Sequence, residues 1–134
     1  MTEMENSYPV GIVGESHYQA AINRTREGDL VAILQELNNP YSKTGTALRV
    51  DNSNGETIGY IAEDHWLRDA LIHQKKGCRA SVLGIEGEPK GVVLEIHLGG
   101  EVMPVIEYGK KSIPSNAGPT SIASMARNLF KRFS

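Results

Sequence analysis

The residues of this sequence that could do chemistry are aromatic rings and small polar side chains placed beside turns. Three open an expected helix, three lie in the turn NNPYS at 38–42, and one follows a glycine in an expected strand. Aromatic rings stack on unpaired bases, which contributes about 1–3 kcal/mol per base, and a helix start offers backbone N–H groups to an anion. The pattern favours a nucleic-acid-binding site made of Ser16, His17, Tyr18, Asn39, Tyr41, Ser42 and Tyr60.

Each of these residues also has a structural interpretation. Tyr18 and Tyr60 could be core aromatics that keep only the hydroxyl in water. Tyr41 is harder to explain in this way, because a small polar residue would form the turn more easily than a large ring. The turn therefore raises the question of what the ring is for.

The sequence offers no convincing catalytic or metal-binding set. It contains no Walker loop, dinucleotide fingerprint, GxSxG or HExxH motif. The four histidines show no close metal-ligand spacing with one another or with Cys78, and a half-buried thiol is the ordinary state of a single cysteine. Most of the sixteen carboxylates are expected on exposed faces, as solvated charges. We therefore predict a protein that is not an enzyme and has no cofactor and no metal.

Length and composition indicate one soluble globular domain. The chain has 134 residues, of which 40% are apolar and 22% charged. Its apolar runs are too short to cross a membrane, and its first residues, MTEMENSYP, do not have the pattern of a secretory signal. One cysteine excludes an internal disulfide and suits a reducing compartment. We predict a cytoplasmic protein.

The charge is unevenly placed along the chain. The net charge is −2, with −5 in residues 1–118 and +3 in residues 119–134. Indiscriminate duplex binding depends on many phosphate contacts and is not favoured by an acidic domain. A nucleic-acid site on the main domain must therefore be local.

Periodicity predicts a mainly β domain over residues 1–108. Strands are expected at 8–14, 29–37, 79–87, 91–98 and 101–108, with a hairpin over 46–62 whose turn is Asn54-Gly55. The last of these strands contains Pro104 and should lie at an edge. Helices are expected over 15–28, where Ser16 and Gln19 form a capping-box pattern, and over 63–77. Six or seven short strands with two helices favour a small closed or nearly closed barrel.

The C-terminal part of the chain has a different composition. Residues 109–120 resemble a linker, and residues 121–134 form an amphipathic pattern. A helix of this length is marginal alone in water, so its apolar face should pack on the barrel, on a second copy, on a partner protein or, less favourably, on a membrane surface. This makes a protein-interaction adaptor, using the barrel and the C-terminal helix, the alternative function. The apolar stripe is Ile122, Met125, Ala126, Leu129, Phe130 and Phe133.

Four stretches in order resemble the HIRAN domain: GIVGESHYQ at 11–19, LNNPYS at 37–42, ALRV at 47–50 and NGETIGYI at 54–61. That domain occurs at the N-terminus of DNA-repair translocases and as a stand-alone bacterial protein, to which GESHYQ is more similar. The resemblance implies a six-stranded barrel of the OB or SH3 type with two helices. It also implies binding of single-stranded DNA, in the eukaryotic members at a free 3′ end.

By position, the resemblance implies a stacking role for Tyr41 and a role for Asn39 in a turn that holds a terminal 3′-hydroxyl. The ring would then lie in the turn to face a base. The same comparison shows four departures: His17 stands in place of a second stacking tyrosine, Ser16 of an arginine, Ser42 of an aspartate and Glu63 of a lysine. These departures bear on 3′-end recognition more than on the fold.

Overall fold

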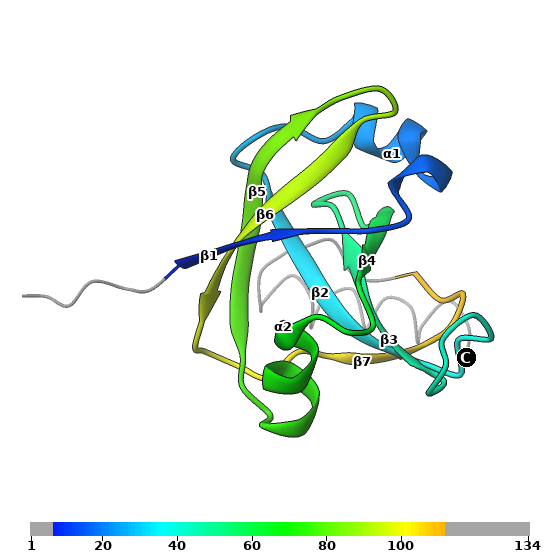
Figure 1. Ribbon diagram of the computed structural model, residues 1–134, viewed down its shortest axis with the longest axis vertical. Helices are drawn as coiled ribbons and strands as arrows, with labels where there is room; N and C mark the ends of the chain where they lie inside the picture. Colours follow the sequence, from blue (N-terminus) through cyan, green and yellow to red (C-terminus); the bar gives the residue numbers. More distant parts are fainter. Residues whose placement is uncertain (1–6, 112–134) are drawn as a thin grey trace, which may run out of the picture.

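The computed structural model describes residues 7–111, which form a mainly β domain with seven strands (Figure 1). The predicted C-terminal helix at 121–134 and most of the predicted linker lie outside the described residues. In chain order the elements are β1 Ser7–Gly11, η1 Glu15–His17, α1 Gln19–Asn23, β2 Leu30–Leu37, β3 Thr46–Asp51, β4 Thr57–Ile61, α2 Trp66–Arg68, η2 Asp69–His73, β5 Cys78–Glu86, β6 Gly91–Leu98 and β7 Val105–Glu107.

The sheet is antiparallel in the order β1-β6-β5-β2-β3-β4, with β7 added in parallel to β2. β2 is the central strand, because its start pairs with β5, its end pairs with β7, and β3 runs along its other edge. The sheet is not closed into a continuous barrel, so of the predicted closed or nearly closed barrel the closed form is not confirmed. Its two ends are joined instead by an isolated bridge, in which Val13 and Tyr60 exchange two backbone hydrogen bonds of 2.8 and 2.9 Å.

Gly59 makes this bridge possible. A Cβ atom at this position would lie 2.7 Å from Cδ1 of Ile12 and 2.8 Å from the carbonyl oxygen of Val13. Any side chain here would push the two segments apart. The IGY step of the sequence thus brings Tyr60 against the chain that leads into η1.

Alternation along the strands fills one apolar core between the halves of the folded sheet. The period of two that indicates a strand at 91–98 puts Val92, Leu94 and Ile96 on one face of β6, and all three are buried. Leu48 and Ile58, from the hairpin of β3 and β4, lie in the same fully buried cluster. The core therefore fixes the faces of the strands that carry the site residues.

The first helix is much shorter than predicted, and its expected cap does not form. A three-residue 3₁₀ turn, η1, precedes the five-residue α1, and Gly14 is the N-cap without a side-chain hydrogen bond. Ser16 lies inside η1. Gln19 bonds the carbonyl oxygens of Glu15 and Lys90 instead of completing a capping box. The helix start that was expected to offer N–H groups to an anion is therefore a short 3₁₀ turn, and anion binding there stays a prediction.

The second helix is also shorter than the predicted 63–77. It begins after His65, whose Nδ1 accepts a hydrogen bond from the Leu67 N–H, and it continues as a π-helical turn to His73. No helix among the described residues has the length and apolar character needed to cross a membrane.

The predicted hairpin over 46–62 is confirmed, but its turn is wider than the two-residue form. The Asn52 N–H donates to the Glu56 carbonyl, and the Asn52 side chain accepts from the Asn54 and Glu56 N–H groups. Gly55 has a positive φ of 80°, whereas Asn54 is not among the residues with positive φ. The Asn52 side chain therefore stabilises the wider turn through hydrogen bonds to its backbone.

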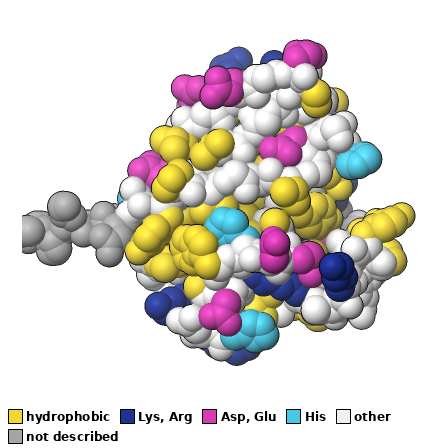
Figure 2. Space-filling view, viewed as in Figure 1, with side chains coloured by type: hydrophobic (Ala, Val, Ile, Leu, Met, Phe, Trp, Pro, Cys, Tyr) yellow, Lys and Arg dark blue, Asp and Glu magenta, His cyan; other side chains and the backbone are white. Residues whose placement is uncertain are grey.

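The face in Figure 2 shows acidic and basic side chains interspersed among apolar ones, with no broad basic surface in this view of the described residues. Trp66 is one of the exposed apolar residues, and its ring packs edge-on against Tyr8 with a centroid distance of 5.1 Å. The interspersed charges agree with the expectation that a nucleic-acid site here must be local.

Candidate nucleic-acid interface

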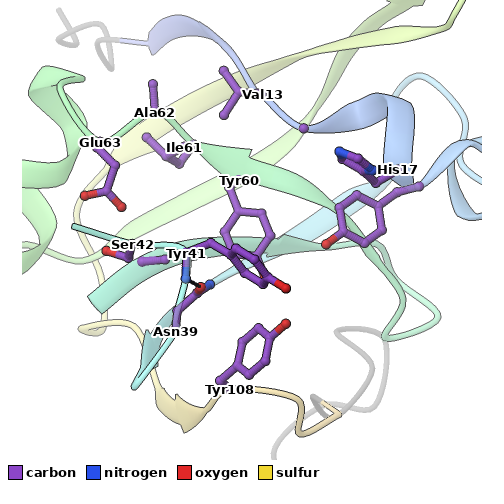
Figure 3. Close-up of a pocket in the computed structure, with 13 residues that line it drawn as sticks. Val13, His17, Asn39, Tyr41, Ser42, Tyr60, Ile61, Ala62, Glu63 and Tyr108 are labelled. Carbon is purple, nitrogen blue, oxygen red and sulfur yellow. Dashed lines mark hydrogen bonds between the residues drawn. The ribbon is translucent and has the colours of Figure 1, made fainter. Parts of the chain in front are cut away.

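A groove of about 630 Å³ gathers six of the seven predicted site residues. Its walls come from the segment before α1, the turn after β2, the end of β4 and the residue after β7 (Figure 3). Ser16 is exposed but does not line the groove, so the structure does not bring it to the others. The lining residues are Val13, Gly14, His17, Tyr18, Asn39, Tyr41, Ser42, Ala47, Tyr60, Ile61, Ala62, Glu63 and Tyr108.

The turn after β2 is built by the side chain of Asn39, not by the tyrosine. Asn39 is buried; its Oδ1 accepts from the Tyr41 N–H at 2.8 Å, and its Nδ2 donates to Oε1 of Glu36 at 2.9 Å. Ser42 closes the other side, where its hydroxyl donates to the Thr46 carbonyl at 3.0 Å. Both polar side chains are thus already engaged within the turn.

The Tyr41 ring is 85% exposed, although the turn that carries it is well held. It faces Tyr108, itself 43% exposed, with ring centroids 6.4 Å apart and planes inclined by 63°. In Figure 3 the two rings come from different segments, the NPY turn and the end of β7. The two rings form an aromatic edge to the groove that no packing of the described core requires.

The opposite wall is also aromatic. Tyr18 lies 6.4 Å from Tyr60 and 6.4 Å from His17, measured between ring centroids. Tyr18 and Tyr60 are half-buried, whereas His17 is exposed. Tyr18 and Tyr60 are therefore partly packed on the domain, as the structural interpretation expects, and also line the groove, as the binding interpretation expects.

Beneath the groove lies a buried network of charges that the sequence did not indicate. Arg49 donates from Nη1 to Glu36 at 2.9 Å, and from Nε and Nη2 to the two oxygens of Asp51, both at 3.0 Å. Glu36, Arg49 and Asp51 are 1%, 3% and 0% exposed. Burial acts to lower the pKa of Arg49, but the hydrogen bonds and charges of Asp51 and Glu36 outweigh it and hold that pKa above its ordinary value. The predicted solvation of these two carboxylates is therefore wrong.

Glu36 connects this network to the groove. Its Oε1 accepts from the Tyr60 hydroxyl at 2.8 Å and from Asn39 Nδ2 at 2.9 Å. Burial raises the pKa of Tyr60, and the Glu36 carboxylate raises it further. Tyr60 consequently stays protonated and points its hydroxyl inward at neutral pH. One buried carboxylate oxygen thus positions residues on two walls of the groove.

The groove itself carries little charge. Glu63 is the one acidic residue among its described lining residues, and none of them is Lys or Arg. Arg68 lies beside Glu63, with 3.8 Å between Nη2 and Oε1, and also donates to the Thr44 hydroxyl in the NPY turn region. An apolar, aromatic cleft of this kind suits a flat ring better than a bare anion.

Tyr108 and Glu36 are the site residues that sequence reasoning missed. Tyr108 reaches the groove because β7 runs parallel to β2, and its N–H donates to the Leu37 carbonyl at 3.0 Å. No local pattern announces a parallel pairing between segments about seventy residues apart. For Glu36, which lies between Gln35 and Leu37 in the expected strand at 29–37, no local pattern indicated burial.

Metal-ligating side chains do not gather in the described part of the chain, where no group of three His, Cys, Asp or Glu could hold an ion. Cys78 is partly buried, and burial raises the pKa of its thiol to about 11. A thiol of that pKa is almost wholly protonated at neutral pH and is a poor nucleophile.

Comparison with known proteins gives one match in sequence and one in structure, and no family model matches. Over 74 residues the chain is 32% identical to the helicase-like transcription factor of Oryctolagus cuniculus, a match that covers 55% of this chain and 7% of that protein. The chain thus spans only a small part of its curated relative. It also superposes on the crystal structure of the HIRAN domain of human HLTF with a TM-score of 0.55 and 22% identity, covering 72% of this chain and 77% of that one.

These two matches concern the same protein type, and the second concerns the domain that the motifs of the sequence resemble. Residues 7–111 provide the strands and the groove described above. The resemblance read from GIVGESHYQ, LNNPYS and NGETIGYI is confirmed, and the chain has the HIRAN fold.

Proposed function

We propose that this protein is a non-catalytic nucleic-acid-binding module whose groove takes an unpaired base of single-stranded DNA. The observation that carries the proposal is the Tyr41 ring, which is 85% exposed on a turn that other side chains hold. An exposed ring on a well-held turn is suited to base stacking, because little conformational entropy is lost when a base binds.

The rest of the groove supports the same ligand. Tyr108 provides a second ring beside Tyr41, and Tyr60 and Tyr18 line the opposite wall. Base stacking is tolerant of sequence because every base has a π-face. We therefore infer general single-strand binding by stacking, with the turn residues Asn39 and Ser42 holding the turn that carries the Tyr41 ring.

Direct binding of labelled single-stranded oligonucleotides at low salt, followed by fluorescence anisotropy, tests the proposal. We expect Tyr41→Ala to weaken binding by about fivefold to more than a hundredfold, which corresponds to the loss of about 1–3 kcal/mol of stacking on one base. Trp66→Ala is the matched control, because Trp66 is an exposed aromatic outside the groove lining. Equal binding by wild type and Tyr41→Ala would refute the site.

A second comparison separates strand-end binding from general single-strand binding. The same oligonucleotide is prepared with a free 3′-hydroxyl and with a 3′-phosphate. The Asn39 amide and the Ser42 hydroxyl of the NPY turn are already bonded within the protein. We expect the two oligonucleotides to bind within about threefold of each other; binding only to the free hydroxyl would instead assign the turn an end-reading role.

A further inference from the structure

A second groove of about 520 Å³ adjoins the first and shares three of its tyrosines, Tyr18, Tyr60 and Tyr108. It extends away from the NPY turn toward the β3–β4 hairpin turn and the segment after β7. The two grooves therefore adjoin at these three tyrosines and form one path. A ligand longer than one base would follow this path.

The two halves of the path differ in charge. No Lys or Arg is among the described residues that line the first groove, whereas Lys110 and Lys111 line the second. Both lysines are exposed, and the Lys110 N–H donates to the Glu107 carbonyl at 3.1 Å, which fixes the backbone of this turn after β7. The path thus has an apolar aromatic end and a basic end.

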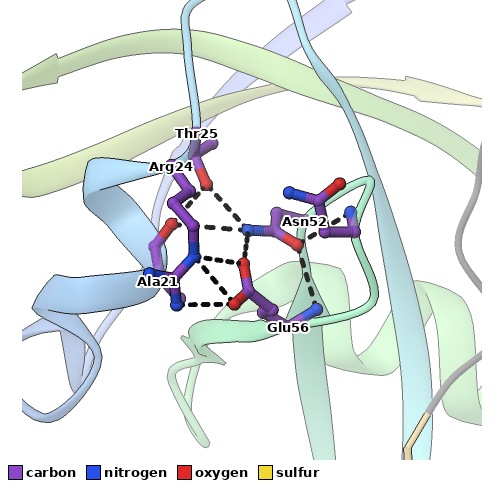
Figure 4. A network of polar contacts seen from close by, with 6 residues as sticks. Ala21, Arg24, Thr25, Asn52 and Glu56 are labelled. Atoms are coloured by element: carbon purple, nitrogen blue, oxygen red, sulfur yellow. Dashed lines mark hydrogen bonds and ion pairs between the residues drawn. The ribbon is translucent and has the colours of Figure 1, made fainter.

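The other charged residues of the second groove already have partners. Arg49 is held by the buried carboxylates Glu36 and Asp51 and is 3% exposed. Glu56 accepts from Arg24 Nη2 at 2.6 Å and from Arg24 Nε (Figure 4). Its hydrogen bonds to Arg24 and to Asn52 Nδ2 lower the pKa of the Glu56 carboxyl to about 2.

This leaves the two lysines as the uncommitted charges among the described residues of the second groove. Every nucleotide of a single strand brings one negative phosphate, and lysine is a flexible point charge suited to it. We propose that the second groove binds phosphates of the same DNA strand through Lys110 and Lys111, while the first groove holds a base. This inference rests on the proposed function and adds the direction in which the strand leaves the first groove.

The salt dependence of binding to a thymidine decanucleotide tests the proposal. Two lysine–phosphate contacts on a single strand contribute about 1.4 to the slope of log affinity against log salt. Between about 50 and 200 mM salt the wild type should therefore lose about seven times more affinity than K110Q/K111Q. The control K75Q/K76Q removes the same charge from another adjacent lysine pair, which lies outside both grooves, and should keep the wild-type slope.

The Tyr41→Ala variant makes the two proposals separable. It should weaken binding at every salt concentration while keeping the wild-type slope. Loss of affinity in Tyr41→Ala with an unchanged slope in K110Q/K111Q would overturn only the second groove. Equal slopes in the two lysine variants, both lower than the wild type, would assign the effect to overall charge and also overturn it. A wild type that binds no oligonucleotide would refute the proposed function, and the inference with it.

Discussion

Replacing Arg49 by methionine should reveal how strongly the buried charges under the groove hold the domain together. Arg49 is the cation between two buried carboxylates, and it makes three side-chain hydrogen bonds of 2.9–3.0 Å to them. Methionine replaces the aliphatic part of the arginine side chain but has neither charge nor donors. Glu36 and Asp51 would then remain buried without their counter-ion, at exposures of 1% and 0%.

The expected cost follows from the burial of these groups. Breaking a buried ion pair by removing one partner costs about 3–5 kcal/mol. A domain of this size is stable by about 5–15 kcal/mol, so R49M should lose about a fifth or more of its free energy of unfolding. At roughly 4–8 °C for each kcal/mol, the melting temperature should fall by at least about 12 °C.

Urea unfolding followed by tryptophan fluorescence measures this change, since Trp66 is the sole tryptophan. R49K keeps the charge but cannot reach both carboxylates with a planar fork, so its loss should be about half that of R49M. The variant R49M/E36Q/D51N removes the unpaired charges and should be more stable than R49M. If R49M lost less than about 1 kcal/mol, or if neutralising the carboxylates brought no recovery, the unpaired charge would not be the source of the cost.

Three further predictions concern single residues. Gly59→Ala should destabilise the domain by about 1–3 kcal/mol in urea unfolding, because its Cβ would meet Val13 O and Ile12 Cδ1 below 3 Å; Gly28→Ala, where the same added Cβ has open space but an unfavourable φ, controls for backbone strain. The pKa of the Tyr60 hydroxyl is raised in the folded protein, so the stability that the protonated hydroxyl contributes is complete below about pH 10 and is lost progressively as the pH rises above it. Tyr60→Phe should therefore reduce the fall in the free energy of unfolding at alkaline pH. An unchanged fall in that variant would contradict this. Burial raises the pKa of the Cys78 thiol to about 11 from 9.0, so its thiolate fraction at neutral pH should be about a hundredfold smaller than that of an unperturbed thiol. Cys78 should therefore react slowly with a disulfide reagent. A rate equal to that of free cysteine would show that the thiol is not buried in solution.

Local patterns predicted the parts of the fold that depend on neighbouring residues. The alternation of β6 placed Val92, Leu94 and Ile96 in the core, and Asn54-Gly55 marked the hairpin. Helix lengths were overestimated because capping residues such as Ser16 and Gln19 indicate where a helix can begin. The length of the helix depends on tertiary packing, which the capping residues do not indicate. In this chain Gln19 bonds the Lys90 carbonyl, a contact 71 residues distant in sequence.

The aromatic residues of the candidate site were predicted largely from the sequence, but the buried charged network beneath them was not. Six of the predicted residues line the groove. They could be predicted because turn residues and glycines in the sequence indicate loops at the surface, where binding residues are common. Glu36, Arg49 and Asp51 looked like ordinary solvated charges, since carboxylates and guanidinium groups are seldom fully buried. Only the pairing of β2 with β3, which sets Glu36 beside Ala47 and Leu34 beside Arg49, brings the three charges to one place.

The buried network and the exposed ring are parts of one arrangement. Oε1 of Glu36 accepts from both Tyr60 and Asn39, and Asn39 in turn fixes the backbone at Tyr41. The ring in the turn therefore needs no packing of its own to keep its place. A large aromatic side chain that is dispensable for the turn, exposed to solvent and held by buried charges is poorly explained by stability alone. It is well explained by a ligand that offers the ring a flat face, which is why the effect of Tyr41→Ala on binding should far exceed its effect on unfolding.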